Sequence, residues 1–343
     1  MEGAFDKRKV IFGLKISVII SVITLVYLFS LTIDEDTVQK AISINPFYLT
    51  LAFIVNILIW IAGGWRIKLL VQALGEEISL KKSVEIFLSG SFISNVTPFA
   101  SGGGPFQIVL LHSEKIPLGK ASAVMILQFL LKLIFFNITT PILFWKFRYL
   151  IDLDFISPRL FNIVLGLVFS ISVLVMIFIW QANKIKVLIK LLEEFSLTKK
   201  LLRRKVAQKI IKRLYKEVDE ATASLKEMSY YKKSTLIWAF IATALFWVLF
   251  FIVAPIILLG LGEAPFFLES FVIQMVFYLI LPYIPTPGGS GVAELGFVSL
   301  FTPFFARETV GLLAIFWRVL TFYSVLVIGG VVLYKLLDEN VVL

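Results

Sequence analysis

The sequence has no cysteine among its 343 residues and a single histidine, His112. The absence of cysteine excludes disulfides, thiolate nucleophiles and cysteine-ligated metals. His112 has neither a second histidine nor paired carboxylates at ligand spacing, so we predict no metal site. The Walker pattern Gly-x4-Gly-Lys-Ser/Thr is missing as well. We therefore expect neither a bound cofactor nor ATP as the source of energy.

Charged residues are also scarce, because they make up only 16% of the chain, whereas 59% is hydrophobic and the mean hydropathy is +0.93. A soluble domain of this length exposes far more charge. The composition therefore predicts an integral membrane protein. The apolar run at 10–33 follows a basic cluster and is too long for the core of a signal peptide, so we interpret it as a retained first span.

Long apolar runs predict an all-α polytopic membrane protein with about six full transmembrane helices. The predicted spans are 10–31, 47–65, 121–145, 160–181, 234–259 and 309–334. Two further apolar segments, 83–111 and 266–304, are interrupted by prolines and glycines. Each is either a broken re-entrant hairpin, which enters the membrane and turns back, or a pair of full crossings.

The distribution of lysine and arginine predicts the orientation of the chain. The N-terminus is basic and segment 32–46 is acidic, whereas residues 182–233 hold fifteen Lys/Arg against six Asp/Glu. We therefore expect both termini and the 182–233 loop to be cytoplasmic. The loop has the apolar periodicity of amphipathic helices, which would rest either on the anionic inner leaflet or on the protein itself. Because the surplus charge lies in this one loop, we expect no nucleic-acid partner.

The two interrupted segments resemble each other, which indicates an internal repeat. One reads "TPFASGGGPFQ" from Thr97 and the other reads "TPGGSGVAE" from Thr286. Span, interrupted segment and span occupy 47–145 in the first unit and 234–334 in the second. The predicted orientation makes the two units inverted relative to each other, as in many secondary transporters. The alternative is that both segments are structural hairpins that only pack the bundle.

Broken backbone at membrane depth persists only where protein surrounds it or where it lines a wet cavity. We expect Gly104 and Gly291 to be N-caps, so that Gln107 and Glu294 both fall at the third helical position. Two helix N-termini facing each other would present N–H groups to an anion. The candidate substrate-binding residues in these segments are Thr97, Pro98, Gly102, Gly103, Gly104, Gln107, Thr286, Pro287, Gly288, Gly289, Ser290, Gly291 and Glu294.

Two cations, Lys132 and Arg318, lie in the middle of apolar spans, where an unpaired charge is costly. Lys132 follows Gln107 by 25 residues and Arg318 follows Glu294 by 24. We include both as candidate contacts for a phosphate, although either could instead form a structural pair with Glu294. Glu294 itself could cap its helix, accept a cationic headgroup or carry a proton. Arg66 is expected to anchor at the cytoplasmic interface.

The motifs "NVTPFASGGGPFQ" and "PTPGGSGVAELG" resemble the lysylphosphatidylglycerol synthase transmembrane family, the flippase-like membrane domain of the bacterial multiple-peptide-resistance factor and its stand-alone relatives. The resemblance covers about residues 10–335. It implies a bacterial or archaeal plasma membrane and movement of a lipid between leaflets. The two-domain relatives continue into a soluble aminoacyl-transferase domain, whereas this chain ends at Leu343, so we do not carry the synthase activity over.

The resulting hypothesis is a lipid flippase, not an enzyme. It would move a phospholipid, possibly aminoacylated, or a polyprenyl-phosphate-type lipid, with the headgroup bound between the two broken hairpins. One alternative is a membrane-embedded transferase acting on a lipid-linked substrate, with Glu294 as its base. The other is a non-catalytic membrane scaffold. A homo-oligomer is compatible with each.

Overall fold

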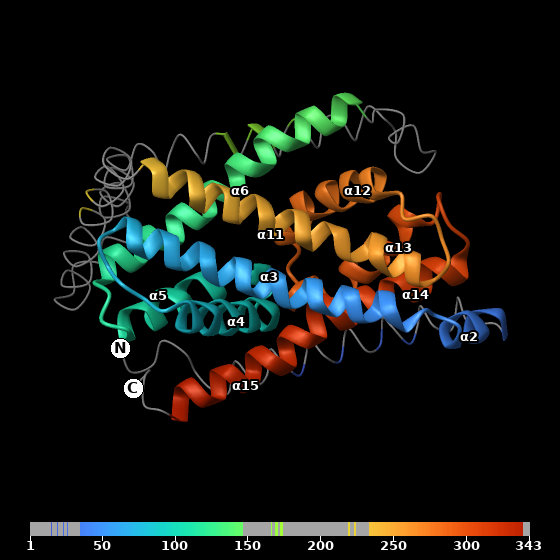
Figure 1. Ribbon diagram of the computed structural model, residues 1–343, viewed down its shortest axis with the longest axis horizontal. Helices are drawn as coiled ribbons and strands as arrows, with labels where there is room; N and C mark the ends of the chain where they lie inside the picture. The colour runs from blue at the N-terminus through green and yellow to red at the C-terminus, as the bar shows by residue number, and fades with distance from the viewer. Residues whose placement is uncertain are drawn as a thin grey trace, which may run out of the picture.

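The computed structural model describes residues 35–146 and 233–338, together with a few isolated positions outside these ranges. This part of the chain is helical and contains no strand (Figure 1). Its elements in chain order are α2 (Glu35–Ile42), α3 (Pro46–Ala73), α4 (Leu80–Val96), η1 (Pro98–Ala100), α5 (Gly103–Ser113), α6 (Leu118–Lys146), α11 (Lys233–Gly260), α12 (Phe267–Ile280), η3 (Leu281–Tyr283), η4 (Pro287–Gly289), α13 (Val292–Phe301), α14 (Arg307–Arg318), η5 (Val319–Tyr323) and α15 (Ser324–Asp338).

Four segments of the described chain are long and apolar enough to cross a bilayer. They are Pro46–Ala73, Leu118–Leu143, Lys233–Gly260 and Arg307–Asp338. These confirm four of the predicted spans, and the all-helical fold class with them. The predicted spans 10–31 and 160–181 and the basic loop 182–233 lie outside the described residues.

The centre of the fold is the pair α3 and α11, which run side by side in opposite directions (Figure 1). Helix α4 packs on α3 at very short range, because a Cβ on Gly64 would lie 2.4 Å from Val84 Cγ2. A Cβ on Gly63 would likewise lie 2.6 Å from the ring of Phe87. Small residues at such crossings let helix backbones approach closely where lipid supplies no hydrophobic driving force.

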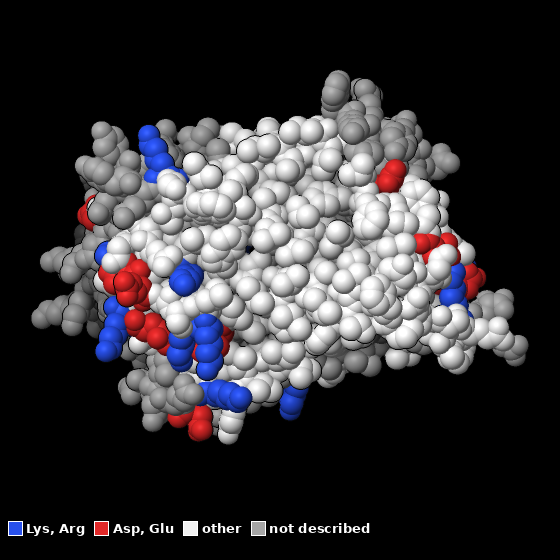
Figure 2. All heavy atoms as spheres, in the orientation of Figure 1, with Lys and Arg blue, Asp and Glu red and all other residues white. Residues whose placement is uncertain are grey.

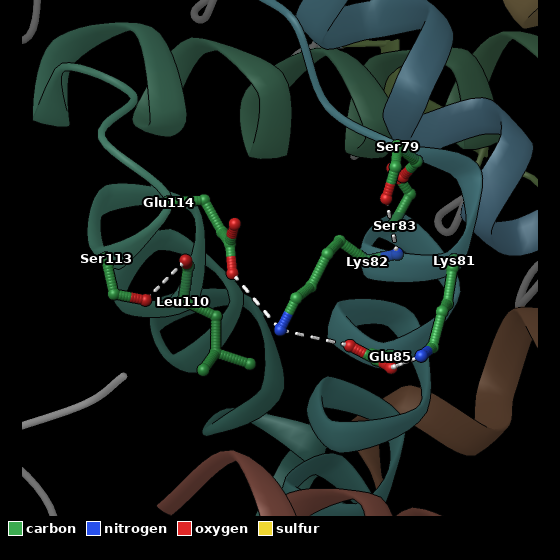
Figure 3. Close-up of polar contacts among 8 residues, drawn as sticks. All are labelled: Ser79, Lys81, Lys82, Ser83, Glu85, Leu110, Ser113 and Glu114. Carbon is green, nitrogen blue, oxygen red and sulfur yellow. Dashed lines mark hydrogen bonds and ion pairs between the residues drawn. The ribbon is translucent and has the colours of Figure 1, made fainter. Parts of the chain in front are cut away.

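Both interrupted segments turn back instead of crossing. In the first, Lys82 at the start of α4 lies 3.6 Å from Glu114 at the end of α5, and also 3.4 Å from Glu85 (Figure 3). In the second, the rings of Phe266 before α12 and Phe305 after α13 are 5.6 Å apart. Figure 1 shows α4 and α5 in one half of the molecule and α12 and α13 in the other. The two hairpins therefore enter from opposite ends.

The last span is not a continuous α-helix. Between α14 and α15 the chain forms the π-helix η5, which begins directly after Arg318. The side chain of Asn56 on α3 donates hydrogen bonds to the Leu320 carbonyl at 2.7 Å and to Ser324 Oγ at 3.1 Å. These contacts satisfy backbone that the irregular helix leaves free, as π-bulges require inside a membrane.

On the face that Figure 2 shows, the charged side chains gather at the two ends of the molecule and leave a broad uncharged area between them. One end carries the ion pairs of Lys82 and the pair Lys120–Glu76. The other carries Lys40, whose Nζ lies 2.5 Å from Glu263 Oε1. This arrangement is what a bilayer-spanning protein needs, because its apolar belt faces acyl chains.

Candidate functional site

The first broken stretch, residues 97–102, is termed the first elbow. Its Thr97 ends α4, and the Thr97 hydroxyl donates to the Ile93 carbonyl at 2.8 Å and accepts from the Gly102 N–H at 3.0 Å. Between them Phe99 and Ala100 adopt φ values of 56° and 51°. Side chains at positive φ are strained, so the elbow is held in a conformation that its own residues do not favour.

The second elbow, residues 286–291, repeats this backbone with glycine. Gly288 and Gly289, the counterparts of Phe99 and Ala100, have φ values of 61° and 65°. The Thr286 hydroxyl differs from that of its counterpart, because it is buried and has no hydrogen-bond partner among the described residues. A buried hydroxyl without a partner is costly, which makes Thr286 a candidate ligand contact.

The two elbows touch each other, because η1 and η4 are in contact; the η1 residues 98–100 are exposed, whereas Pro287 and Gly289 of η4 are buried. The approach is close: a Cβ on Gly288 would lie 2.9 Å from the carbonyl oxygen of Asn95 and 2.3 Å from the ring of Phe322. Only glycine fits between these neighbours. The structure thus brings together the two motifs that the sequence analysis aligned, although they come from different halves of the chain.

The contact region is anchored by a buried ion pair. Arg318 Nε donates to Glu294 Oε1 at 2.7 Å, and the two side chains are 4% and 0% exposed. Arg318 Nη2 also donates to the Gly288 carbonyl at 3.3 Å, and Glu294 Oε2 accepts from the Gly291 N–H at 2.7 Å. The guanidinium lies 4.2 Å over the Phe322 ring. Arg318 therefore joins α14 directly to the second elbow.

Glu294 caps its own helix, which confirms one of the three roles predicted for it. Helix α13 begins after the N-cap Gly291, and Glu294 is its third residue. The corresponding prediction for the first hairpin is wrong by two residues, because the N-cap of α5 is Gly102 and not Gly104. The tight loop that Thr97 closes onto the Gly102 N–H starts the helix early.

The other predicted site residues of the first hairpin differ in whether they are packed against α4 or have open space beside them. Gly103 packs against α4, where an added Cβ would meet the Ser94 hydroxyl at 1.8 Å. Gln107 is buried and lies against Gly90 of α4. An added Cβ on Gly104 would meet nothing within 4 Å, so space is open beside it. In this hairpin it is therefore Gly104, not Gln107, that borders free volume.

Pro98 is exposed on the outer side of the first elbow, whereas Pro287 and Ser290 of the second are buried. The second elbow is thus the more enclosed of the two.

Lys132 does not share the ion pair with Arg318 and Glu294. Its ammonium lies 5.3 Å from the Trp247 ring and 5.9 Å from the Phe136 ring. It lines a cavity of about 80 Å³ between α6 and α12 that reaches Tyr283, just before the second elbow. The structure therefore brings one of the two predicted cations to the elbows and places the other beside a cavity next to them.

The sequence analysis missed a third buried cation. Arg66 was expected at the cytoplasmic interface, but it is only 8% exposed and donates to Gln128 Oε1 at 3.0 Å. Its guanidinium lies 5.2 Å from the Phe246 ring. Because of this burial α3 continues to Ala73, past the predicted end of the span at residue 65. Its partners come from distant helices, so no local signal marked it.

A polar cluster at the opposite end ties three elements together. Lys40 of α2 contacts Glu263 and donates to the Thr309 hydroxyl at 2.6 Å, while that hydroxyl donates to Glu263 Oε1 at 3.0 Å. The hydrogen bond from Lys40 lowers the pKa of Glu263 below its ordinary value, with the Thr309 bond and the Lys40 charge acting in the same direction against a smaller opposing effect of burial. The cluster fastens α2 to the start of α14.

Comparison with known proteins agrees with the two motifs. The sequence matches the family described as lysylphosphatidylglycerol synthase TM region over residues 10–329. A UPF0104 membrane protein of Archaeoglobus fulgidus is 24% identical over 332 residues, covering 95% of this chain and 98% of that protein. A second UPF0104 membrane protein, from Methanocaldococcus jannaschii, is 33% identical over 96 residues, which is 27% of this chain and 29% of that protein. The chain is therefore a multi-pass membrane protein that belongs to the lysylphosphatidylglycerol synthase transmembrane-region family.

Proposed function

We propose that the protein is a lipid transporter that moves a phospholipid or a polyprenyl-phosphate-type lipid between leaflets. The headgroup would bind where the two elbows meet, while the acyl or prenyl chains stay in the bilayer. One observation carries the proposal. Two re-entrant hairpins that enter from opposite ends touch beside a buried Arg318–Glu294 ion pair.

The chemistry of this pair suits a lipid headgroup. Arg318 offers a planar fork that pairs with phosphate oxygens, and Glu294 would accept a headgroup amine. The Thr286 hydroxyl is buried without a partner among the described residues, so it is ready to bond a ligand. In the described conformation Arg318 and Glu294 neutralise each other. A headgroup would therefore have to replace their contact with contacts of its own.

The order of the helices along the chain is also the one expected of a transporter that works by alternating access. Helices α3 to α6 and helices α11 to α15 each supply a span, a broken hairpin and a span, and the hairpins point in opposite directions (Figure 1). We propose that they are inverted repeats, and that one unit rocks against the other around the elbows.

The orientation follows from charge. The end with α4 and α5 carries several exposed lysines, which the positive-inside rule assigns to the cytoplasm of a bacterial or archaeal cell. We propose that both termini lie on this side. The basic loop 182–233 would then rest on the anionic inner leaflet.

The test is reconstitution into liposomes with a fluorescent phospholipid, followed by the loss of dithionite-accessible label over time. Glu294→Gln removes the carboxylate that would accept the headgroup amine, a charge-assisted hydrogen bond of about 1.5–3 kcal/mol, so we expect the translocation rate to fall by about ten- to a hundredfold. Glu76→Gln is the matched control, because the Lys120–Glu76 contact is equally short at 2.6 Å but lies at the end of the molecule. Equal rates for the two variants would refute the assignment of the site.

The same preparation tests the two rival functions. New lipid products that depend on Glu294 would favour a membrane transferase. A protein that neither moves lipid nor makes a product, but whose Glu294 and Arg318 tolerate substitution in cells, would favour a scaffold. Both oxygens of Glu294 already accept hydrogen bonds, from Arg318 and Gly291, which leaves it poorly placed to act as a base.

A further inference from the structure

A cavity beside Lys132 is separate from the elbow contact. Lys132 is the fifteenth residue of the 29-residue helix α6, so it lies near the middle of the bilayer. The cavity has a volume of about 80 Å³, enough for a few water molecules or one small polar group, but not for a whole lipid. Its lining consists of Phe129, Lys132, Leu133, Phe136, Asn137, Thr140, Phe169, Ser172, Tyr278, Leu279 and Tyr283.

The positive charge at this cavity has no acidic partner in the described part of the chain. Among the residues that the structure describes, no carboxylate forms an ion pair with Lys132 or with Arg66. The two cations are neighbours, because Arg66 bonds to Gln128, which lies one turn before Lys132 on α6. Lys132 is stabilised there by the faces of Phe136 and Trp247. An unpaired cation at membrane depth normally marks a functional site.

A second side chain in the cavity lacks a partner. Thr140 is 7% exposed, its hydroxyl has no hydrogen-bond partner in the described part of the chain, and it lines the cavity two turns after Lys132. The other small polar groups are already engaged, because Ser172 donates to Asn137 Oδ1 at 2.9 Å and Asn137 donates to the Leu133 carbonyl at 2.8 Å. The cavity thus offers an ammonium and a free hydroxyl, both of which donate to oxygen.

The apolar walls of the cavity and its opening toward the protein surface indicate that the remainder of the ligand is apolar. Apart from these groups the lining is aromatic and aliphatic. Phe129, Phe169 and Tyr283 on the lining are 45%, 42% and 59% exposed on the surface of the protein, where acyl chains would surround them. A chain attached to a group in the cavity could therefore leave directly into the bilayer.

We propose that this cavity binds the single oxyanion group of a lipid, a phosphate monoester or a carboxylate, with Lys132 and Thr140 as its donors. The inference rests on the proposed function, because it makes the cavity a second resting place for the anionic end of the transported lipid, next to the elbows. The shared chemistry is the oxyanion. A free phosphate ion is the other source of that chemistry, and the experiment separates the two.

The experiment measures binding by native mass spectrometry on the full-length protein in a neutral detergent, with dodecyl phosphate and inorganic phosphate as probes. We expect dodecyl phosphate to bind at least about tenfold more weakly to Lys132→Met than to the wild type, and Lys132→Arg to keep part of the affinity. Lys120→Met is the matched control, because Lys120 lies on the same helix but pairs with Glu76 at its end. Equal affinity of Lys132→Met and wild type would overturn the proposal.

Thr140→Val keeps the measurement informative if Lys132→Met fails to fold. Valine has nearly the same volume and removes a hydroxyl that has no partner, so the unliganded protein should be as stable as the wild type. We expect its affinity for dodecyl phosphate to fall several-fold. An unchanged affinity would count against the site. Inorganic phosphate that binds as tightly as dodecyl phosphate would overturn the assignment to a lipid.

The binding measurement also separates this inference from the proposed function. It requires no transport, so a protein that binds dodecyl phosphate through Lys132 but never moves lipid would keep the site and lose the transporter. Conversely, translocation that depends on Glu294 while Lys132→Met binds normally would keep the transporter and remove this site.

Discussion

The buried Arg318–Glu294 pair predicts strongly non-additive effects of substitution on the free energy of unfolding. The two side chains meet at 2.7 Å and are almost completely buried. Removing one partner of such a pair leaves the other charge unpaired, which costs about 3–5 kcal/mol. We therefore expect Arg318→Met alone and Glu294→Gln alone to be strongly destabilising. Arg318→Met should have the larger effect, because it also removes the contacts with the Gly288 carbonyl and the Phe322 ring, whereas a glutamine oxygen at 294 can still accept from Arg318.

The double variant should recover much of this loss. With methionine at 318 and glutamine at 294 neither member of this pair is charged, and the glutamine carbonyl can still accept from the Gly291 N–H. Replacing a whole buried pair by uncharged groups is often nearly neutral. The coupling energy between the two sites should therefore reach at least about 3 kcal/mol, the upper end of the range for residues in contact.

Unfolding in mixed detergent, followed by circular dichroism, measures this double-mutant cycle. The pair Lys120–Glu76 is the control: its contact is 2.6 Å, but its side chains are 32% and 28% exposed, so its coupling should not exceed about 1 kcal/mol. If the two single costs at 318 and 294 add to within about 0.5 kcal/mol, the residues are not coupled and the reasoning fails. If the double variant is stable and also moves lipid at the wild-type rate, the pair is structural only.

Three further predictions concern the backbone and the outer cluster. Phe99→Gly should raise the thermal midpoint, because a side chain at φ 56° is strained by about 1–2 kcal/mol and glycine removes this strain. Gly288→Ala at the matching position should lower the thermal midpoint. Equal effects of the two substitutions would contradict the alignment of the elbows. Asn56→Leu should cost about 1–3 kcal/mol in the same unfolding assay, because it removes the donor to the π-helix η5; an unchanged stability would refute that role. Glu263 has a lowered pKa, so the stability that its charge contributes is present above the ordinary carboxyl pKa and is lost as the pH falls. The difference in thermal midpoint between the wild type and Glu263→Gln should therefore shrink below about pH 4.3. A difference that stays constant with pH would exclude the contact with Lys40 as its cause.

Much of the fold could be predicted from the sequence, because apolar length alone marks a span. The predicted segments 121–145 and 234–259 differ from the observed spans by only a few residues. The span that begins near residue 47 was predicted to end too early, since Arg66 and Lys68 look like an interface when their surroundings are unknown. Burial of Arg66 against Gln128 is a tertiary fact, and it decides the end of that span.

The elbows could be found from the sequence for a different reason. Proline after threonine, followed by glycine, marks positions where a helix stops and the backbone turns to positive φ. Phe99 and Ala100 carry no such signal, although they take the same conformation as Gly288 and Gly289. Here the tertiary contact overrides local preference, and the two segments could be aligned because both carry Thr-Pro followed by glycines.

The location of Lys132 could not be predicted. Its spacing from Gln107 matches that of Arg318 from Glu294, but spacing along the chain does not fix how a helix is rotated about its axis. In the fold Arg318 points to the second elbow, whereas Lys132 faces Trp247 and a cavity. Two residues at similar distances from the two motifs thus lie in different surroundings.

The contact between the elbows has a consequence for biogenesis. Translation delivers the first hairpin to the membrane long before the ribosome has made the second, and until then its bent backbone lacks the contact with the second elbow. Irregular backbone is unfavourable in contact with hydrocarbon, so the insertion machinery must either shield this segment from lipid or release it into the bilayer late. The topology of the first half is therefore completed only by the arrival of the second.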